Sequence, residues 1–153
     1  MRSLTRPSQE NSKRTSSQQP AQQRQLVVVV VGASSGIGHA TAVAFAKRGA
    51  KLVLAARSAD TLAPVVMECL AEGGSALGIP TDVTDSAAVE KLAQRTVSHY
   101  GRIDVWVNAA GVGAVGRFDG VPLAASRRVI ESNLMGHLYG AHAAIQHFRE
   151  TGR

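Results

Sequence analysis

The chain has 153 residues, which is enough for one domain of ordinary size. Hydrophobic residues make up 44% of it and charged residues 18%, a balance that permits a packed core and excludes wholesale disorder. Aromatic residues account for only 4%, too few for a surface that stacks the bases of single-stranded nucleic acid. The single cysteine, Cys69, excludes an internal disulfide and a cysteine-based zinc site.

The net charge of +6 is unevenly distributed along the chain. Much of the excess lies in residues 1–25, which are dominated by Ser, Gln, Arg and Pro and are predicted to be disordered. Residues 26–153 are nearly balanced, so no nucleic-acid partner is predicted. The longest apolar run, Leu26 to Val31, is too short to cross a membrane, and residues 1–25 resemble neither a secretory signal nor a transit peptide. We therefore expect a cytoplasmic protein without a membrane partner.

From residue 26 onward, predicted strands and helices alternate. The strands are expected at 26–31, 51–56, 76–83 and 103–107, and the helices at 36–48, 60–72, 86–100 and 123–150. Strict alternation with short connections indicates parallel strands joined by right-handed crossovers. The predicted fold is a doubly wound α/β domain over residues 26–153, with four strands and helices on both faces of the sheet.

Apolar spacing also predicts which helix faces are buried. On the helix over 36–48, the predicted inward side chains are Ile37, Ala40, Thr41, Ala44 and Phe45. Thr84 or Asp85 is expected to cap the helix over 86–100. On the last helix, the apolar stripe that needs covering comprises Ile130, Leu134, Leu138, Ala141, Ile145 and Phe148. With this stripe uncovered, we expect the isolated chain to fold poorly or to associate.

A glycine-rich segment, Gly32-Ala-Ser-Ser-Gly36-Ile-Gly38, separates the first strand from the first helix. Gly32 would let the chain turn sharply off the strand, and Gly38 would leave room where the helix packs closely on it. Gly36 would let backbone N–H groups approach a pyrophosphate at the helix N-terminus, where the helix dipole favours anions. Its place at the first strand–helix junction makes the segment a candidate dinucleotide site.

Four segments resemble motifs of the short-chain dehydrogenase/reductase family, in the family's order. Val-Gly-Ala-Ser-Ser-Gly-Ile-Gly at 31–38 is similar to the family's cofactor motif, and Asp82-Val83 resembles the pair that contacts adenine. Asn108-Ala-Ala-Gly111 resembles Asn-Asn-Ala-Gly, and Ser132-Asn-Leu134 resembles the segment that carries a structural and catalytic Asn. The resemblance covers residues 26–153. It implies a Rossmann-type sheet, incomplete in this chain, with four strands in the order 3-2-1-4 and the outer edge of the fourth strand unpaired.

This resemblance implies an oxidoreductase that transfers hydride between a nicotinamide cofactor and a small-molecule carbonyl or secondary alcohol, often as a homo-oligomer. It implies cofactor contacts at Gly32, Ser34, Ser35, Gly36, Ile37, Gly38, Arg57, Asp82, Val83, Asn108, Ala109, Ala110 and Gly111.

The end of the second strand predicts the cofactor. An Asp or Glu there would accept hydrogen bonds from a free ribose 2′-hydroxyl and select NAD. The chain has Ala56 followed by Arg57, whose guanidinium would bind a 2′-phosphate. NADP(H) is therefore predicted in preference to NAD(H). The alternative is that Arg57 is a surface residue that merely ends a strand.

The family's proton-transfer groups are a Tyr, a Lys four residues later and a Ser. Tyr100 and Tyr139 are followed four residues on by Asp104 and Ala143, so neither fits this pattern. The resemblance assigns one catalytic residue, Asn133, which holds a helix irregularity open and orders a water. We expect a cofactor-binding fragment of a longer reductase. The alternative is a catalytically inactive dinucleotide-binding or interaction module, and a nucleic-acid binder acting through the basic segment is ranked below both.

No metal site is predicted. His137, His142 and His147 recur every five residues, so they point in different directions on a helix and are interpreted as surface or interface residues. His39 either lies near a phosphate or is an ordinary residue of the first helical turn. Trp106 and Cys69 are both expected in the core, the latter as an inert thiol.

Overall fold

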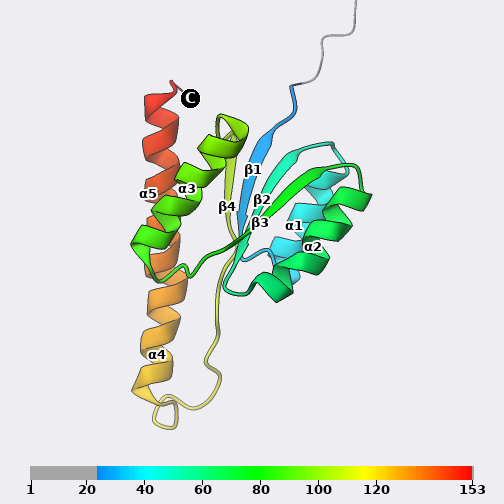
Figure 1. Ribbon diagram of the computed structural model, residues 1–153. Coiled ribbons are helices and arrows are strands. Elements are labelled where there is room, and N and C mark those ends of the chain that lie inside the picture. Colours follow the sequence, from blue (N-terminus) through cyan, green and yellow to red (C-terminus); the bar gives the residue numbers. More distant parts are fainter. Residues whose placement is uncertain (1–23, 153) are drawn as a thin grey trace, which may run out of the picture.

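A computed structural model describes residues 24–152 of the chain. Except for Arg24 and Gln25, the segment 1–25 that is predicted to be disordered lies outside the described residues. The strands form one parallel sheet in the order β3-β2-β1-β4, which confirms the predicted order (Figure 1). They are β1 (Val27–Val31), β2 (Lys51–Ala56), β3 (Ser75–Pro80) and β4 (Val105–Asn108).

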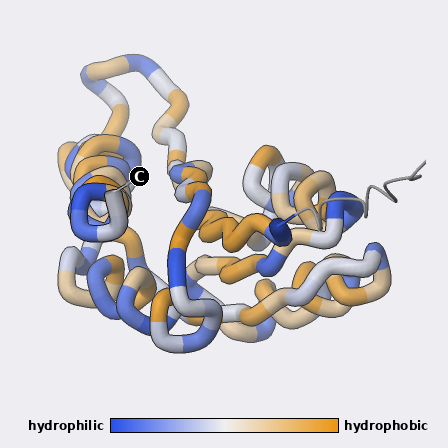
Figure 2. The backbone as a smooth tube through the Cα atoms, turned by 90° about the horizontal axis from the view of Figure 1, so that it is seen from above, coloured by the Kyte–Doolittle hydropathy of each residue, from blue (hydrophilic) through white to orange (hydrophobic). Residues whose placement is uncertain are grey.

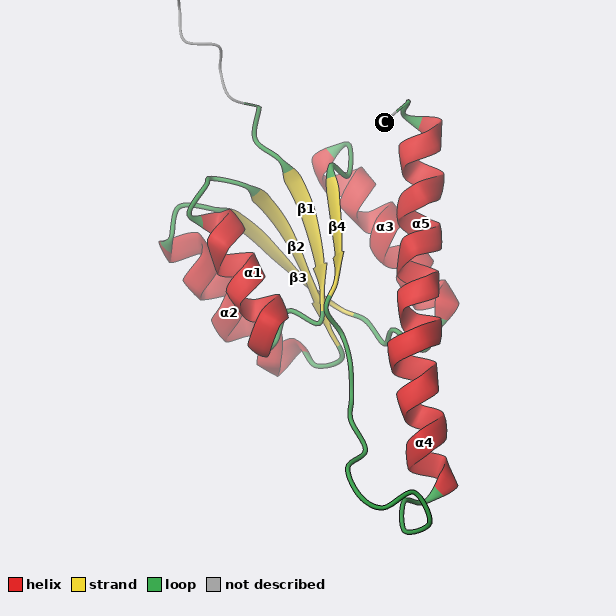
Figure 3. Ribbon diagram, turned by 180° about the vertical axis from the view of Figure 1, so that it is seen from behind, coloured by secondary structure: helices red, strands yellow, loops and turns green. Residues whose placement is uncertain are grey.

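Helices cover both faces of this sheet. Figure 3 shows α1 and α2 on one face and α3 and α5 on the other, so the predicted doubly wound architecture is confirmed. The helices are α1 (Gly36–Ala46), α2 (Ala59–Ala71), α3 (Ser86–Tyr100), α4 (Leu123–Ile130) and α5 (Gly136–Glu150). Among the described residues, no helix is both long and apolar enough to span a membrane.

The centre of the molecule is built on β1. All five of its valines are at most 3% exposed, as expected for a parallel strand with helices on both sides. Val28 and Val30 belong to the cluster beneath α1 and α2, whereas Val29 and Val31 belong to the cluster on the opposite face. Seen from above, the central strands are largely hydrophobic (Figure 2).

The buried face of α1 differs from the predicted one. Gly38, Ala42 and Ala46 are buried, while Ile37 is 81% exposed. The reason is the close approach of α1 to the sheet, because a Cβ atom on Gly38 would overlap the carbonyl oxygen of Gly32. Small residues therefore face inward on this helix, and the spacing of its bulkier residues does not identify the buried face.

Two strand boundaries also differ from the prediction. β3 ends at Pro80, so Asp82 and Val83 lie in the loop beyond the strand. β4 begins at Val105 rather than at 103. Trp106, predicted to lie in the core, is only half-buried because β4 is an edge strand in the described part of the chain. Between the two strands, Asp85 caps α3 by accepting hydrogen bonds from the amides of Ala87 and Ala88, at 2.9 and 3.3 Å.

The predicted long C-terminal helix is divided by a π-helical turn. This turn, η1 (Glu131–Met135), joins α4 to α5 and contains Asn133. Figure 1 shows α4 and the preceding loop reaching well beyond the sheet. Four residues of the predicted apolar stripe on this helical segment are each more than half exposed: Ile130, Leu134, Leu138 and Ile145.

Candidate cofactor-binding site

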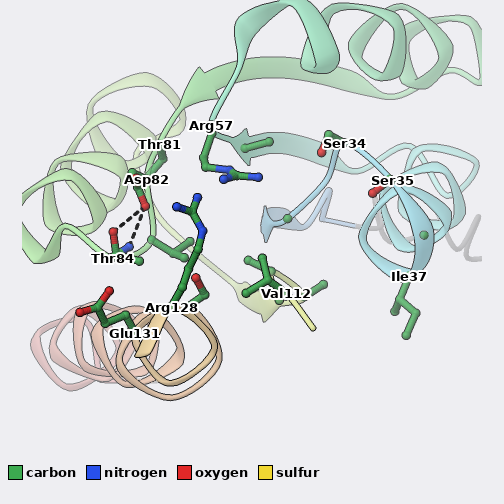
Figure 4. A pocket seen from close by; sticks show the side chains of 18 residues that line it. Ser34, Ser35, Ile37, Arg57, Thr81, Asp82, Thr84, Val112, Arg128 and Glu131 are labelled. Atoms are coloured by element: carbon green, nitrogen blue, oxygen red, sulfur yellow. Dashed lines mark hydrogen bonds between the residues drawn. The ribbon is translucent and has the colours of Figure 1, made fainter. Parts of the chain in front are cut away.

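A cleft of about 370 Å³ opens at the carboxyl edge of the sheet. It lies where connections from β1 and β4 run to opposite faces, the place at which open α/β sheets bind ligands. Most of the predicted cofactor contacts line it (Figure 4): Gly32, Ser34, Ser35, Gly36, Ile37, Arg57, Asp82, Val83, Ala109, Ala110 and Gly111.

Gly32 sets the path of the loop between β1 and α1. Its φ of +85° lies in the left-handed region that favours glycine, and its amide donates to the carbonyl of Ala55 at 2.7 Å. A Cβ atom on Gly32 would overlap the backbone of Ala109 and Ala110. Glycine is therefore required here both by the backbone conformation and by the close approach of the loop that follows β4.

The N-terminus of α1 fits the pyrophosphate of a dinucleotide. No side chain caps this helix, and its first turn contains no acidic residue. Gly36 has a φ of +55°, and no heavy atom outside its immediate neighbours lies within 4 Å of the place where a Cβ atom would stand. The helix thus presents uncapped backbone N–H groups and the positive end of its dipole to open space in the cleft.

Asp82 supplies a fixed negative charge on the wall formed by the loop after β3. Its Oδ1 accepts hydrogen bonds from the backbone amide and the hydroxyl of Thr84, at 3.0 and 2.8 Å. These two bonds are the largest causes of a lowered pKa of Asp82, and the positive charges of Arg57 and Arg128 lower it further. The carboxylate is therefore ionised at neutral pH and acts as an acceptor.

Asn108 does not line the cleft. Its Oδ1 accepts a hydrogen bond of 2.9 Å from the indole of Trp106, and its Nδ2 donates to the carbonyl of His137 at 3.2 Å. A Cβ atom on Gly140 would overlap Asn108 Oδ1, so α5 packs closely against the end of β4. Asn108 therefore holds the strand against the helix, and it is the following residues, from Ala109 onward, that face the cleft.

Asn133, in the π-helical turn, holds the loop after β4 in place. Its side chain donates to the carbonyl of Val112 and accepts from the amide of Val112, both at 2.9 Å. His137, one turn further on, forms a 2.7 Å hydrogen bond with the carbonyl of Ala110. Asn133 itself is exposed and is not among the residues that line the cleft. Gly38 also lies outside the lining, beneath the glycine loop.

Several residues that line the cleft are not predicted from the sequence. They are Ala56, Thr81, Thr84, Val112, Arg128, Glu131 and Ser132. Ala56 and Thr81 could have been found, because they adjoin predicted site residues at the ends of neighbouring strands. Arg128 gives no such signal, since only the packing of α4 beside the cleft brings it there.

The histidines do not form a metal site, and no group of metal-ligating side chains occurs within residues 24–152. His147 is buried, which corrects its predicted placement as a surface or interface residue. His142 is exposed, as predicted, and His137 is half-buried and hydrogen-bonded to backbone. His39 pairs with Glu68 of α2 at 2.7 Å. Cys69 is buried, as predicted, and burial is the main cause that raises the pKa of its thiol, ahead of the nearby charges of Glu68 and Glu72.

A doubly wound parallel sheet with a glycine-rich loop and an uncapped helix N-terminus at its carboxyl edge defines a dinucleotide-binding type of domain. A model of the short chain dehydrogenase family matches residues 26–153, and the chain belongs to this family.

Relatives and solved structures agree with this assignment. An uncharacterized oxidoreductase of Bacillus subtilis, YxnA, is 38% identical over 122 residues, which are 80% of this chain and 34% of that protein. Versicolorin reductase 1 of Aspergillus parasiticus is 39% identical over 123 residues, or 80% of this chain and 47% of that protein. The alcohol dehydrogenase of Thermococcus sibiricus complexed with 5-hydroxy-NADP has 32% identity and a TM-score of 0.79, over 84% of this chain and 55% of that one. The chain thus spans less than half the length of the two relatives.

Proposed function

We propose that this chain is the NADP(H)-binding part of a short-chain oxidoreductase that reduces a carbonyl or oxidises a secondary alcohol. The observation that carries the proposal is the cleft that joins an uncapped helix N-terminus to Arg57 at the end of β2. When bound, the nicotinamide ring of the cofactor would supply or accept the hydride. Support comes from the family membership and from the structural neighbour that is complexed with 5-hydroxy-NADP.

Each wall of the cleft has a proposed role in binding. The amides around Gly36 would donate to the pyrophosphate, and Arg57 would bind the ribose 2′-phosphate. Asp82 would accept from the amino group of adenine, because its charge is held in place by Thr84. The backbone of Ala110 and Gly111 would line the nicotinamide side, held there by Asn133 and His137 through the contacts described above. Asn133 is the residue proposed to take part in the proton relay.

Neither tyrosine is placed to act as the proton-transfer group. The hydroxyl of Tyr100 is 3.0 Å from Ser75 Oγ at the start of β3, the opposite edge of the sheet from the cleft. Tyr139 is not among the residues that line the cleft. We propose that the Tyr, Lys and Ser of the family's chemistry lie in a part of the whole protein beyond this chain. The alternative function, an inactive dinucleotide-binding module, would show saturable NADPH binding without turnover.

Cofactor binding is tested by titrating the chain with NADPH and NADH and following the nucleotide fluorescence. We expect Arg57→Asp to weaken NADPH binding by about 10- to 150-fold, the range for one charge-assisted hydrogen bond. It should not weaken NADH binding, because a carboxylate at the end of β2 can accept a hydrogen bond from the free 2′-hydroxyl. Arg95→Asp is the matched control, because Arg95 is an exposed residue of α3 outside the cleft and makes the same charge change. Unchanged NADPH affinity in Arg57→Asp would overturn the assignment of NADP(H).

The proposed partners are a small-molecule carbonyl or alcohol and, for the whole protein, a second copy of itself. The exposed apolar side chains Leu134, Leu138 and Ile145 support an association of η1 and α5 with further protein. Sedimentation velocity at several protein concentrations tests this association. A cytoplasmic location is proposed from the single cysteine, which suits a reducing compartment.

A further inference from the structure

Arg128 reaches the cleft from the wall opposite Arg57. It lies on α4, whereas Arg57 follows β2, and both line the same cavity. Figure 4 shows the side chain of Arg128 rising from α4 toward Arg57 and Asp82. Two guanidinium groups from elements far apart in the sequence thus face one shared space.

The two arginines that line the cleft differ in ion pairing from the neighbouring Arg127. Arg127 pairs with Glu131 at 4.0 Å along the helix. Neither Arg57 nor Arg128 makes an ion pair within 4.0 Å in the part of the chain that the structure describes. Both positive charges act on the carboxylate of Asp82, but its Oδ1 already accepts two hydrogen bonds from Thr84. The other carboxylate of the cleft lining, Glu131, is the partner of Arg127, which lies outside the lining. The two guanidinium groups of Arg57 and Arg128 therefore outnumber the one remaining carboxylate, and a bound anion would neutralise the excess positive charge.

We propose that Arg128 is a second specificity-determining residue, which clamps the 2′-phosphate of the cofactor together with Arg57. The inference rests on the proposed NADP(H) binding and adds a contact from α4 to it. A phosphate held between two guanidinium groups accepts charge-assisted hydrogen bonds from both sides, an arrangement that a single arginine cannot provide. The other role open to Arg128, stacking on the adenine ring, would not depend on the 2′-phosphate.

Two small probes separate these roles. Adenosine 2′,5′-bisphosphate and 5′-AMP share the adenine, the ribose and the 5′-phosphate and differ only in the 2′-phosphate. Their Kd values are measured by isothermal titration calorimetry on the full 153-residue chain and on Arg128→Ala, with far-UV circular dichroism as a check of folding. We expect Arg128→Ala to weaken the 2′,5′-bisphosphate by about tenfold and 5′-AMP by less than about twofold.

Arg127→Ala is the matched control, since Arg127 is adjacent on α4, carries the same charge and does not line the cleft. It should change neither Kd. Arg128→Lys, which keeps the charge but not the planar fork, should recover part of the lost affinity and also serves if Arg128→Ala does not fold. The losses of affinity in Arg57→Ala and in Arg128→Ala should not add up to the loss in the double variant, because the two side chains would share one phosphate.

The outcomes distinguish this inference from the proposed function. If the unmodified chain binds neither probe, the proposed nucleotide site is wrong. If it binds both equally, the preference for NADP(H) is wrong, and the clamp is overturned with it. If it prefers the 2′,5′-bisphosphate but Arg128→Ala weakens both probes equally, or weakens neither, the role of Arg128 alone is overturned.

Discussion

The imidazole Nε2 of His147 accepts a hydrogen bond of 3.0 Å from the backbone amide of Ile103. His147 is 9% exposed and Ile103 is completely buried, so this bond joins the last turns of α5 to the chain just before β4 in a dry environment. A buried amide needs a partner, and Ile103 finds one in a side chain 44 residues away.

Replacing His147 by Leu should lower the free energy of unfolding by about 1–3 kcal/mol, because the amide of Ile103 would lose its acceptor without gaining water. Urea denaturation followed by circular dichroism measures the change. His142→Leu is the control on the same helix, where the side chain is exposed, and it should change stability by less than about 0.5 kcal/mol. Equal stability of the two variants would show that the His147 bond contributes nothing.

Gly32→Ala should destabilise the chain by more than about 2 kcal/mol, since it adds left-handed strain to an overlap with the Ala110 backbone. NADPH affinity should fall as well, because the overlap would displace the loop that lines the cleft. Thermal denaturation and NADPH titration measure the two effects. Gly113→Ala serves as the control, because a Cβ atom at Gly113 meets open space. A Gly32→Ala variant with unchanged melting temperature would contradict the described backbone.

Thr84→Val should raise the pKa of Asp82 toward its ordinary value of 3.8, because it removes the hydroxyl bond and keeps the amide bond. The carboxyl signal of Asp82, followed by NMR during an acid titration, reports this pKa. In the unmodified chain the folded pKa is the lower one. The stabilisation from Asp82 is therefore fully present above about 3.8 and is lost as the pH falls through the folded pKa.

The same linkage predicts how stability depends on pH in the variants. As the pH falls below about 3.8, the free energy of unfolding of Thr84→Val should decrease less than that of the unmodified chain. In Asp82→Asn, the carboxyl group at position 82 should contribute nothing to this pH dependence. If Thr84→Val left the pKa of Asp82 unchanged, the proposed cause of the lowered pKa would be contradicted.

Cys69 should react slowly with an aromatic disulfide reagent in the native chain, because its side chain is buried and its pKa is raised. Urea at concentrations that unfold the chain should make the reaction fast. The control is Met67→Cys in a Cys69→Ala background, since Met67 is 66% exposed on the same helix. Rapid reaction of native Cys69 would show that α2 opens readily.

The sequence by itself determined the alternation of elements and the glycine-rich loop, and its resemblance to a known family implied the order of the strands. Such features are written in short stretches of chain: a run of valines predicts a buried parallel strand, and glycines between a strand and a helix predict the turn that Gly32 makes. The placement of Arg57 beside the cleft also followed from its position after β2. These signals are local, and they do not depend on which distant segment packs against them.

Only the tertiary structure decided which side chains meet across long stretches of sequence. Helical spacing favoured Ile37 as an inward residue, but the close approach of α1 to the sheet admits only small ones such as Gly38. Asn133 meets Val112 from 21 residues away, and His147 meets Ile103 from 44. Arg128 lies beside the cleft because α4 packs there, a contact that no short motif records. The physical reason is that burial and hydrogen bonding act between neighbours in space, and the fold as a whole determines those neighbours.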